Sequence, residues 1–343
     1  MESFVHRLHD LRHVALTVAT AAAVATLAPC ATAIAQDASR QDASGQNVSS
    51  VAGRVVKPGG DSVLAVADAW VTLHRVGTDR AGPVDSTRTN HDGRYRFDYR
   101  RTGAGDAIYF VSSSHHGVAY FSHPLRVGAD SGEDAEIAVF DTTSRAIPIT
   151  VRGRHIIVSR AAPDGERTVT EVFELTNDTS VTKVAPNESV SAAVFSSLIP
   201  PIARSPVVAD GDIPAAAVKF ADSRVLVYAA LAPGMKQLAF HYDLSSDAFP
   251  LHIPLDRGAV VLEILAEDST ATVTGAGLRA VAPVAIEGHT FRRFLAGEVR
   301  PNSVTIISVP ELKQPMELYF VAGLTLVIGG AMTLALARAL RRR

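Results

Sequence analysis

The sequence predicts an all-β protein, built as two antiparallel β-sandwiches followed by one C-terminal transmembrane helix. Between residues 51 and 310, short runs rich in Val, Ile, Thr and aromatic residues alternate with Gly, Pro, Asp and Asn turns. No long segment in this range has the 3.6-residue apolar period of a helix. Many short strands without helices indicate antiparallel sandwiches. Residues 318–337 form an uncharged stretch of the length needed to cross a bilayer, about 30 Å at about 1.5 Å per residue.

The first element in chain order is a secretory signal peptide over residues 1–35. Arg7 and Arg12 supply its positive start, and Val14–Ala28 is an uncharged apolar run. Ala33-Ile34-Ala35 is a small-x-small cleavage site, so we expect the mature chain to begin at Gln36. An uncleaved N-terminal anchor is the alternative, since residues 14–35 could almost span a membrane.

Composition excludes several function classes. Among 343 residues, 47% are hydrophobic and 20% charged, which allows a sizeable core. The net charge of −2 argues against nucleic acid as the main partner, because phosphate binding needs clustered Lys and Arg. The single cysteine, Cys30, rules out an intrachain disulfide or a cysteine metal site. Proline before Cys30 also disfavours a lipoprotein signal.

The exported part divides into a flexible arm and two strand-rich domains. Residues 36–50 are polar and contain no aromatic residue, which indicates an unstructured arm. The first domain covers residues 51–143 and the second covers 147–310, with a polar boundary near residues 142–146. The strands expected in them are Val51–Val56, Ala69–Val76, Tyr95–Tyr99, Ala107–Ser112, Glu136–Phe140, His155–Ser159, Thr168–Thr176, Ala192–Ile199, Val225–Leu231, Gln237–Leu244, Ala259–Ala266 and Ser303–Val309.

Three motifs in the first domain suggest a family. They are Gly53-Arg54-Val55-Val56, then Ala67-Asp68-Ala69-Trp70-Val71-Thr72-Leu73, then Thr89-Asn90-His91-Asp92-Gly93-Arg94-Tyr95-Arg96-Phe97. This domain resembles the carboxypeptidase regulatory-like domain, and the resemblance implies a transthyretin-like sandwich. Independently of the family, Asp92-Gly93 tolerates positive φ in a tight hairpin. These motifs specify the fold and carry no catalytic group, so they indicate almost nothing about function.

The second domain is expected to be an immunoglobulin-like or related sandwich. Pro233-Gly234 indicates a turn before a strand. In that strand Leu238, Phe240 and Tyr242 alternate with mostly polar residues, so one sheet face should be apolar.

Charges around residues 318–337 predict the orientation of the membrane helix. Four arginines follow it in the tail 338–343, whereas the preceding flank is mixed in charge. The positive-inside rule places this basic tail in the cytoplasm and residues 36–317 outside. Membrane lipid is therefore one expected partner. An Ala- and Val-rich composition with few lysines is typical of a bacterial protein, which predicts a single-pass protein of the cytoplasmic membrane with its bulk in the periplasm.

Small residues recur every four positions along the same segment: Thr325, Gly329, Thr333 and Ala337. Such a stripe lets another helix approach closely, which makes these four the candidate helix-packing residues. The alternative is that small residues are simply common in membrane helices.

Local motifs give no support for an enzyme. The sequence has no His-x-x-Glu or His-Glu-x-x-His zinc motif, no Gly-x-Ser-x-Gly elbow and no Walker loop. We therefore expect no catalytic residue, no cofactor and no metal, although triad members dispersed in sequence leave no such local motif.

Two groups of residues in the first domain are alternative candidates for a binding site. His115, His116 and His123 could bind copper or zinc if they met across a hairpin, but the sequence shows no acidic or cysteine ligand beside them. Trp70, Tyr109, Tyr120 and Phe121 could form a sugar-stacking face, against the more usual expectation that such aromatics pack in the core.

The function expected from these features is non-enzymatic. We expect protein–protein contact, for instance as an accessory or stabilising subunit of a larger membrane complex, with an energy-transducing complex as one candidate host. A sugar- or peptide-binding surface module is the second hypothesis, and a metal-binding protein or hydrolase with a dispersed site is the third.

Overall fold

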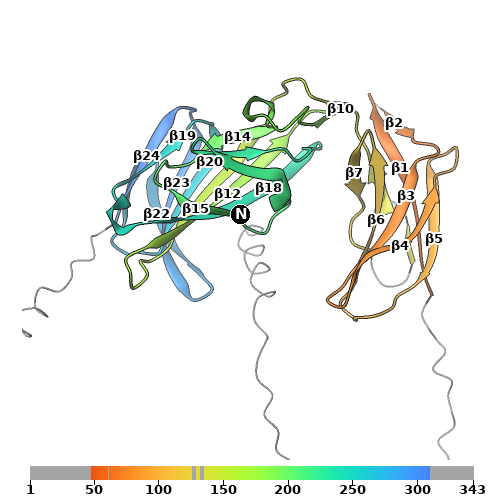
Figure 1. Ribbon diagram of the computed structural model, residues 1–343, viewed down its shortest axis with the longest axis horizontal. Helices are drawn as coiled ribbons and strands as arrows, with labels where there is room; N and C mark the ends of the chain where they lie inside the picture. Colours follow the sequence, from red (N-terminus) through yellow and green to blue (C-terminus); the bar gives the residue numbers. More distant parts are fainter. Residues whose placement is uncertain (1–47, 61, 126–128, 132–134, 310–343) are drawn as a thin grey trace, which may run out of the picture. The chain divides into compact units, whose positions relative to one another are not determined.

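The computed structural model describes residues 48–60, 62–125, 129–131 and 135–309 (Figure 1). The predicted signal peptide 1–35, most of the arm and the predicted membrane helix 318–337 lie outside these ranges. Among the residues within them, no helix is long and apolar enough to cross a membrane. The described chain is mostly β, with several antiparallel sheets and no α-helix.

Before Phe140, the described residues form nine strands. They are β1 (Val48–Gly59), β2 (Ser62–Ala65), β3 (Trp70–Val76), β4 (Ala81–Arg88), β5 (Arg94–Arg100), β6 (Ile108–His115), β7 (Val118–Phe121), β8 (Ala129–Ser131) and β9 (Ile137–Ala138). β1 starts at Val48, so the last three residues of the expected flexible arm already pair with β5.

From Asp141 to residue 309, where the description ends, the chain forms fifteen further strands and three short 3₁₀ helices. The strands are β10 (Thr142–Thr143), β11 (Thr150–Val158), β12 (Arg167–Asn177), β13 (Thr182–Lys183), β14 (Phe195–Leu198), β15 (Arg204–Val208), β16 (Val218–Ala221), β17 (Arg224–Val227), β18 (Gly234–Leu244), β19 (Leu251–Leu255), β20 (Ala259–Ala266), β21 (Thr272–Gly275), β22 (Arg279–Ile286), β23 (His289–Val299) and β24 (Ser303–Ser308). The 3₁₀ helices are η2 (Val190–Ala192), η3 (Ala215–Ala217) and η4 (Ser246–Ala248).

The described residues form two compact units. The first contains the described residues up to Arg152 together with Phe173–Ser197 and Val208–Ala239. The second contains Gly153–Val172, Leu198–Val207 and the described residues from Phe240 onward. Each unit is thus assembled from three separate stretches of chain.

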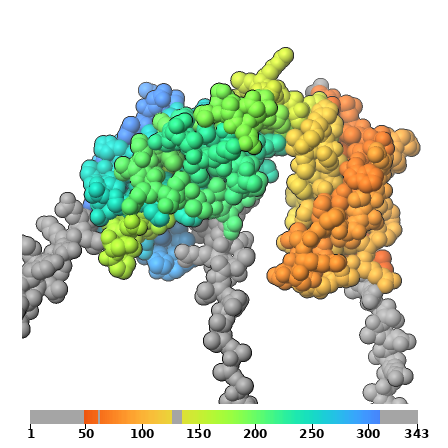
Figure 2. Space-filling model, in the orientation of Figure 1, coloured from red at the N-terminus to blue at the C-terminus, as the bar shows by residue number. Residues whose placement is uncertain are grey.

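Two sheets in the first unit share one hydrophobic core. One has the order β2-β1-β5, with β8 and β9 pairing with β1 in parallel. The other has the order β4-β3-β6-β7. Alternate residues of the strands point into the core, as period-2 patterning requires. The core residues include Val51, Val55, Val71, Leu73, Tyr95, Phe97, Tyr99, Tyr109, Val111, Tyr120 and Ile137. Figure 2 shows the outer surface of these strands, in orange to yellow, with all atoms drawn.

The turn at Asp92-Gly93 connects different sheets, so the predicted tight hairpin is wrong. β4 before the turn pairs with β3, whereas β5 after it pairs with β1. The expected positive φ is present, at 72° for Gly93. The Asn90 side-chain oxygen accepts hydrogen bonds from the backbone N–H groups of Asp92 and Arg94, which closes the turn locally.

Seven strands from the later part of the chain form the largest sheet. Its order is β15-β18-β12-β11-β20-β23-β22, and its β11–β20 pair is parallel. Two three-stranded sheets, β14-β17-β16 and β19-β24-β21, also form in this part. In β18 the predicted apolar face is confirmed, since Leu238, Phe240 and Tyr242 are fully buried.

Candidate functional site

The outward face of the sheet β4-β3-β6-β7 carries aromatic and aliphatic side chains that the core does not use. On β3, Val71 and Leu73 point inward, so Trp70, His74 and Val76 point outward. The cross-strand register places His74 opposite Phe110 and Val76 opposite Ile108 of β6. We call the set Trp70, His74, Val76, Ile108, Phe110 and Phe121 the aromatic face.

Several members of the aromatic face are well exposed. Trp70 is 51% exposed, Phe121 is 59% exposed, and Ile108 and Val76 are 50% and 44% exposed. Scattered exposed apolar residues are normal on proteins, but Val76 and Ile108 are direct cross-strand neighbours and form a contiguous exposed apolar pair.

Ring contacts join three of the six members of the aromatic face. The His74 and Phe110 rings stack with centroids 5.1 Å apart, and Phe121 meets Phe110 edge to face at 5.7 Å. His74 Nε2 also lies 2.8 Å from Ser112 Oγ, and partial burial lowers the pKa of His74. The Arg88 guanidinium lies over the Trp70 ring at 5.2 Å. His74, Phe110 and Phe121 therefore form one packed group, and Trp70 packs separately against Arg88.

From the sequence, we expect the aromatic residues Trp70, Tyr109, Tyr120 and Phe121 to pack in the core. This prediction is confirmed for two of them. Tyr109 and Tyr120 are buried, with 1% and 5% exposure. For Trp70 and Phe121 that expectation is wrong, because both point away from the core. The outward direction of Trp70 could have been predicted from strand alternation. Trp70 precedes the core residue Val71, so it points to the sheet face opposite the one that Val71 and Leu73 share.

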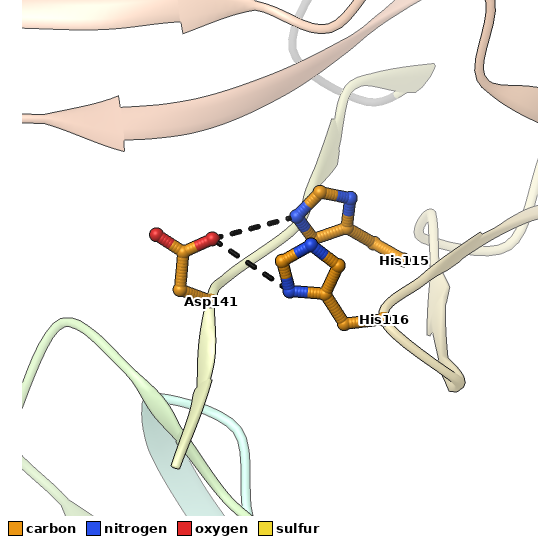
Figure 3. Close-up of side chains that lie close together, drawn as sticks. All are labelled: His115, His116 and Asp141. Atoms are coloured by element: carbon orange, nitrogen blue, oxygen red, sulfur yellow. Dashed lines mark ion pairs between the residues drawn. The ribbon is translucent and has the colours of Figure 1, made fainter.

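The histidines of the β6–β7 hairpin meet a carboxylate that is distant in sequence. His115 Nε2 and His116 Nδ1 lie 3.7 Å and 3.8 Å from Asp141 Oδ1 (Figure 3). His123, the third member of the predicted cluster, is exposed and does not belong to this group. The inference that no acidic ligand accompanies the histidines is therefore wrong. No local pattern points to Asp141, because it follows β9 on a different segment of the chain.

A surface hollow of about 710 Å³ lies between β1, the end of β4 and β5. Its walls include Arg54, Arg88, Arg94 and Arg96. Three of these arginines pair with a carboxylate at 2.8–2.9 Å: Arg54 with Glu136, Arg88 with Asp68 and Arg96 with Asp98. Because most of these charges are compensated locally, the hollow is a weak candidate for anion binding.

Two buried charge groups in the second unit are not apparent from sequence. Glu171 accepts hydrogen bonds from Arg154 and Tyr242. Glu263 lies within hydrogen-bond distance of His155 at 2.6 Å and accepts from Arg293 at 2.5 Å. Burial opposes ionisation of Glu263, but these two partners outweigh it and lower its pKa. All the partners of these two carboxylates lie within the protein, so we assign both Glu171 and Glu263 a role in stabilising the fold.

Comparison with protein-family models and with curated proteins found no match to this chain.

Proposed function

We propose that the protein is a non-enzymatic binding protein, anchored in a membrane, that works through contact between the aromatic face and another protein. The observation that carries the proposal is the exposure of Trp70, Phe121, Val76 and Ile108 on one outward sheet face. Trp and Arg dominate the energetics of many protein interfaces, and the face offers Trp70 with Arg88 stacked on it. A protein partner would bury this apolar area and gain its transfer free energy.

The proposed domain organisation supports the same function. The two sheets of the first unit share one core, as a transthyretin-like sandwich of the carboxypeptidase regulatory-like kind would. In this proposal residues 51–143 form such a domain and residues 147–310 form a second, immunoglobulin-like sandwich. Domains of both kinds commonly present a sheet face or loops to partners, which gives an analogy at the level of fold and nothing more.

The sequence supplies the membrane anchor in this proposal. The signal peptide and the arginine-rich tail predict the same orientation from opposite ends of the chain. The binding domains would then lie on the periplasmic side of a bacterial cytoplasmic membrane. There the protein would act as an accessory subunit of a larger complex, with Thr325, Gly329, Thr333 and Ala337 packing against another membrane helix.

A sugar ligand is the second candidate, and the ring contacts make it the weaker one. Sugar stacking needs an open ring face. One side of the Trp70 ring carries Arg88, and Phe110 is already stacked on His74. The aliphatic side chains of Val76 and Ile108 suit a protein surface better than a carbohydrate.

Affinity purification of the full-length protein from its native membrane in mild detergent tests the proposal. We expect the double variant Trp70→Ser/Phe121→Ser to lose a set of partners that the wild type retains in quantitative mass spectrometry. The matched control is Met235→Ser/Val304→Ser, which alters two side chains of similar exposure (48% each) elsewhere. A Gly329→Leu variant adds a second arm and should lose complex membership while still being exported.

Three outcomes would contradict the proposal. One is an identical partner set for the double variant and the wild type. Another is equal loss in the double variant and its control, because partner binding would then not depend specifically on the aromatic face. The last is glycan-array binding that depends on Trp70, which would favour the sugar candidate.

A further inference from the structure

We propose that His115, His116 and Asp141 form a binding site for a first-row transition-metal ion such as Zn²⁺, and that Lys57 holds the carboxylate when the ion is absent. This site lies in the first unit and does not depend on the aromatic face. Two imidazoles and one carboxylate are a donor set that suits Zn²⁺, Cu²⁺ or Ni²⁺, whereas Ca²⁺ and Mg²⁺ require oxygen ligands.

The hairpin turn brings the two histidines together. His115 ends β6, and the next two residues, His116 and Gly117, both have positive φ, at 48° and 78°. Positive φ at both central residues is the turn geometry that matches the twist of a two-residue hairpin. The turn stacks the two imidazole rings, with centroids 4.1 Å apart and an interplanar angle of 19°.

Backbone contacts fix the segment that carries Asp141. The Tyr120 hydroxyl donates to the carbonyl oxygen of Phe140 at 3.1 Å. The Thr182 N–H donates to the carbonyl oxygen of Asp141 itself at 2.7 Å. The carboxylate is thereby held beside the hairpin, as Figure 3 shows. Holding the ligands in place before the ion binds reduces the entropy lost on binding.

The distances from Asp141 Oδ1 to the two imidazole nitrogens are close to those of an occupied site. The three ligand atoms all lie within 4.8 Å of one another. Bonds of about 2.0–2.2 Å in tetrahedral geometry place ligand atoms about 3.3 Å apart. The observed 3.7 Å and 3.8 Å separations from Asp141 therefore need to shorten by only a few tenths of an ångström. The fourth tetrahedral position would be open to water or to a ligand from another molecule.

The environment of the His115 side chain supports its assignment as a metal ligand. Its Nε2 atom is buried and makes no hydrogen bond to the described residues, which is costly for a polar atom unless something binds it. A metal ion bound to this nitrogen would supply the missing partner.

Lys57 is the competing cation. Its ammonium group donates to both carboxylate oxygens of Asp141, at 3.0 Å and 2.9 Å. The two side chains are 30% and 48% exposed, so the pair is weak and Lys57 can turn into water. A bound ion would replace Lys57 as the counter-charge of Asp141.

Titration of Zn²⁺ into the metal-free, full-length protein by calorimetry tests the site. We expect one Zn²⁺ per chain, with affinity reduced at least about tenfold in His116→Ala. His116 is 55% exposed at its side chain, so this variant should fold. Lys57→Met should tighten binding by about two- to fivefold, because it removes the competing ion pair. His123→Ala is the matched control and should bind as the wild type does.

Thermal unfolding provides a second readout, since an ion that binds only the folded state raises Tm. Zn²⁺ should raise the Tm of the wild type and of His123→Ala but not that of His116→Ala. The proposal is overturned if His116→Ala binds Zn²⁺ as tightly as the wild type, if Lys57→Met binds it more weakly, or if no stoichiometric binding occurs.

Discussion

Glu171 is a fully buried acid whose charge is balanced by its neighbours. Arg154 donates to its Oε2 atom from Nε at 2.9 Å and from Nη2 at 2.7 Å, and the Tyr242 hydroxyl donates to Oε1 at 2.9 Å. Burial, followed by the adjacent carboxylate, raises the pKa of Tyr242 well above its usual value. A buried ion pair adds little net stability, but removing one partner leaves an uncompensated charge.

Glu171→Gln should therefore be strongly destabilising. The change removes the negative charge while Arg154 stays buried, so we expect the free energy of unfolding to fall by about 3–5 kcal/mol. Chemical denaturation measures this difference. The matched control is Glu166→Gln, which breaks the exposed Arg204–Glu166 pair and should cost far less. Equal effects of the two substitutions would contradict the structural role assigned to Glu171.

At the scale of single residues, strand alternation predicts which way a side chain points more reliably than which partner it meets. Glu171 shares its strand face with Val169, Phe173 and Leu175, so a charge on an apolar face is visible from alternation. Its partner Arg154 lies on another strand, and nothing local in sequence connects the two. Asp141 and the histidines show the same limit, because long-range pairing brings them together.

Among the elements, the turn before β5 depends on glycine. Gly93 has φ of 72°, a conformation that L-residues rarely adopt. A Cβ atom at this position would also lie 2.7 Å from the carbonyl oxygen of Val55. The turn is therefore specified by both conformation and close packing.

Gly93→Ala should lower the free energy of unfolding by at least about 1 kcal/mol, because it adds backbone strain and a steric contact. Gly105→Ala is the control, since Gly105 has no positive φ and a Cβ atom there would meet no described atom within 4 Å. Thermal denaturation of both variants compares them. A Gly93→Ala protein as stable as Gly105→Ala would show that the turn can relax.

Strands with a buried alternate face could be predicted, and exposed strands could not. β3, β5, β12 and β18 overlap the predicted segments because their inward residues are apolar. β2 and most of β22 are exposed, with no period-2 apolar pattern, so only pairing with a neighbour makes them strands. The parallel β11–β20 pair joins segments that are far apart in sequence, which local patterns do not report.

Across the whole molecule, folded-state interactions lower the pKa of several side chains. A hydrogen bond from Arg75 lowers the pKa of Asp79, and one from Lys57 lowers that of Asp141. A backbone hydrogen bond from Arg160 lowers the pKa of Glu267. Burial lowers the pKa values of His74 and His115. In each case the unfolded chain binds protons at a higher pH than the folded chain does.

Stability should therefore decrease as the solution becomes acidic. A group with a depressed folded pKa contributes its full stability above its unfolded pKa and loses it as pH falls toward its folded pKa. The two histidines give a first decrease below their ordinary value of 6.5, and the carboxylates give a further decrease below 4.5 and 3.8. Tm measured from neutral to acidic pH should fall throughout; a Tm that rises on acidification would contradict this.

For the molecule as a whole, the mostly β fold class could be predicted from the sequence, whereas the arrangement of the strands into sheets could not. Short strands, turn residues and the lack of helical periodicity were sufficient to predict a mostly β protein. The division into two compact units follows tertiary contacts, and each unit combines chain segments separated by other strands. Such assembly depends on which strands pair, and pairing is decided by packing across long sequence distances.

Trp70 is the only tryptophan among the 343 residues, and it is half exposed on the aromatic face. The intrinsic indole fluorescence of the protein therefore originates at the proposed contact surface alone. Association with a partner there would shift the emission to shorter wavelength and shield the ring from soluble quenchers. The fluorescence of Trp70 can thus report directly on whether a partner occupies the aromatic face, without an added label.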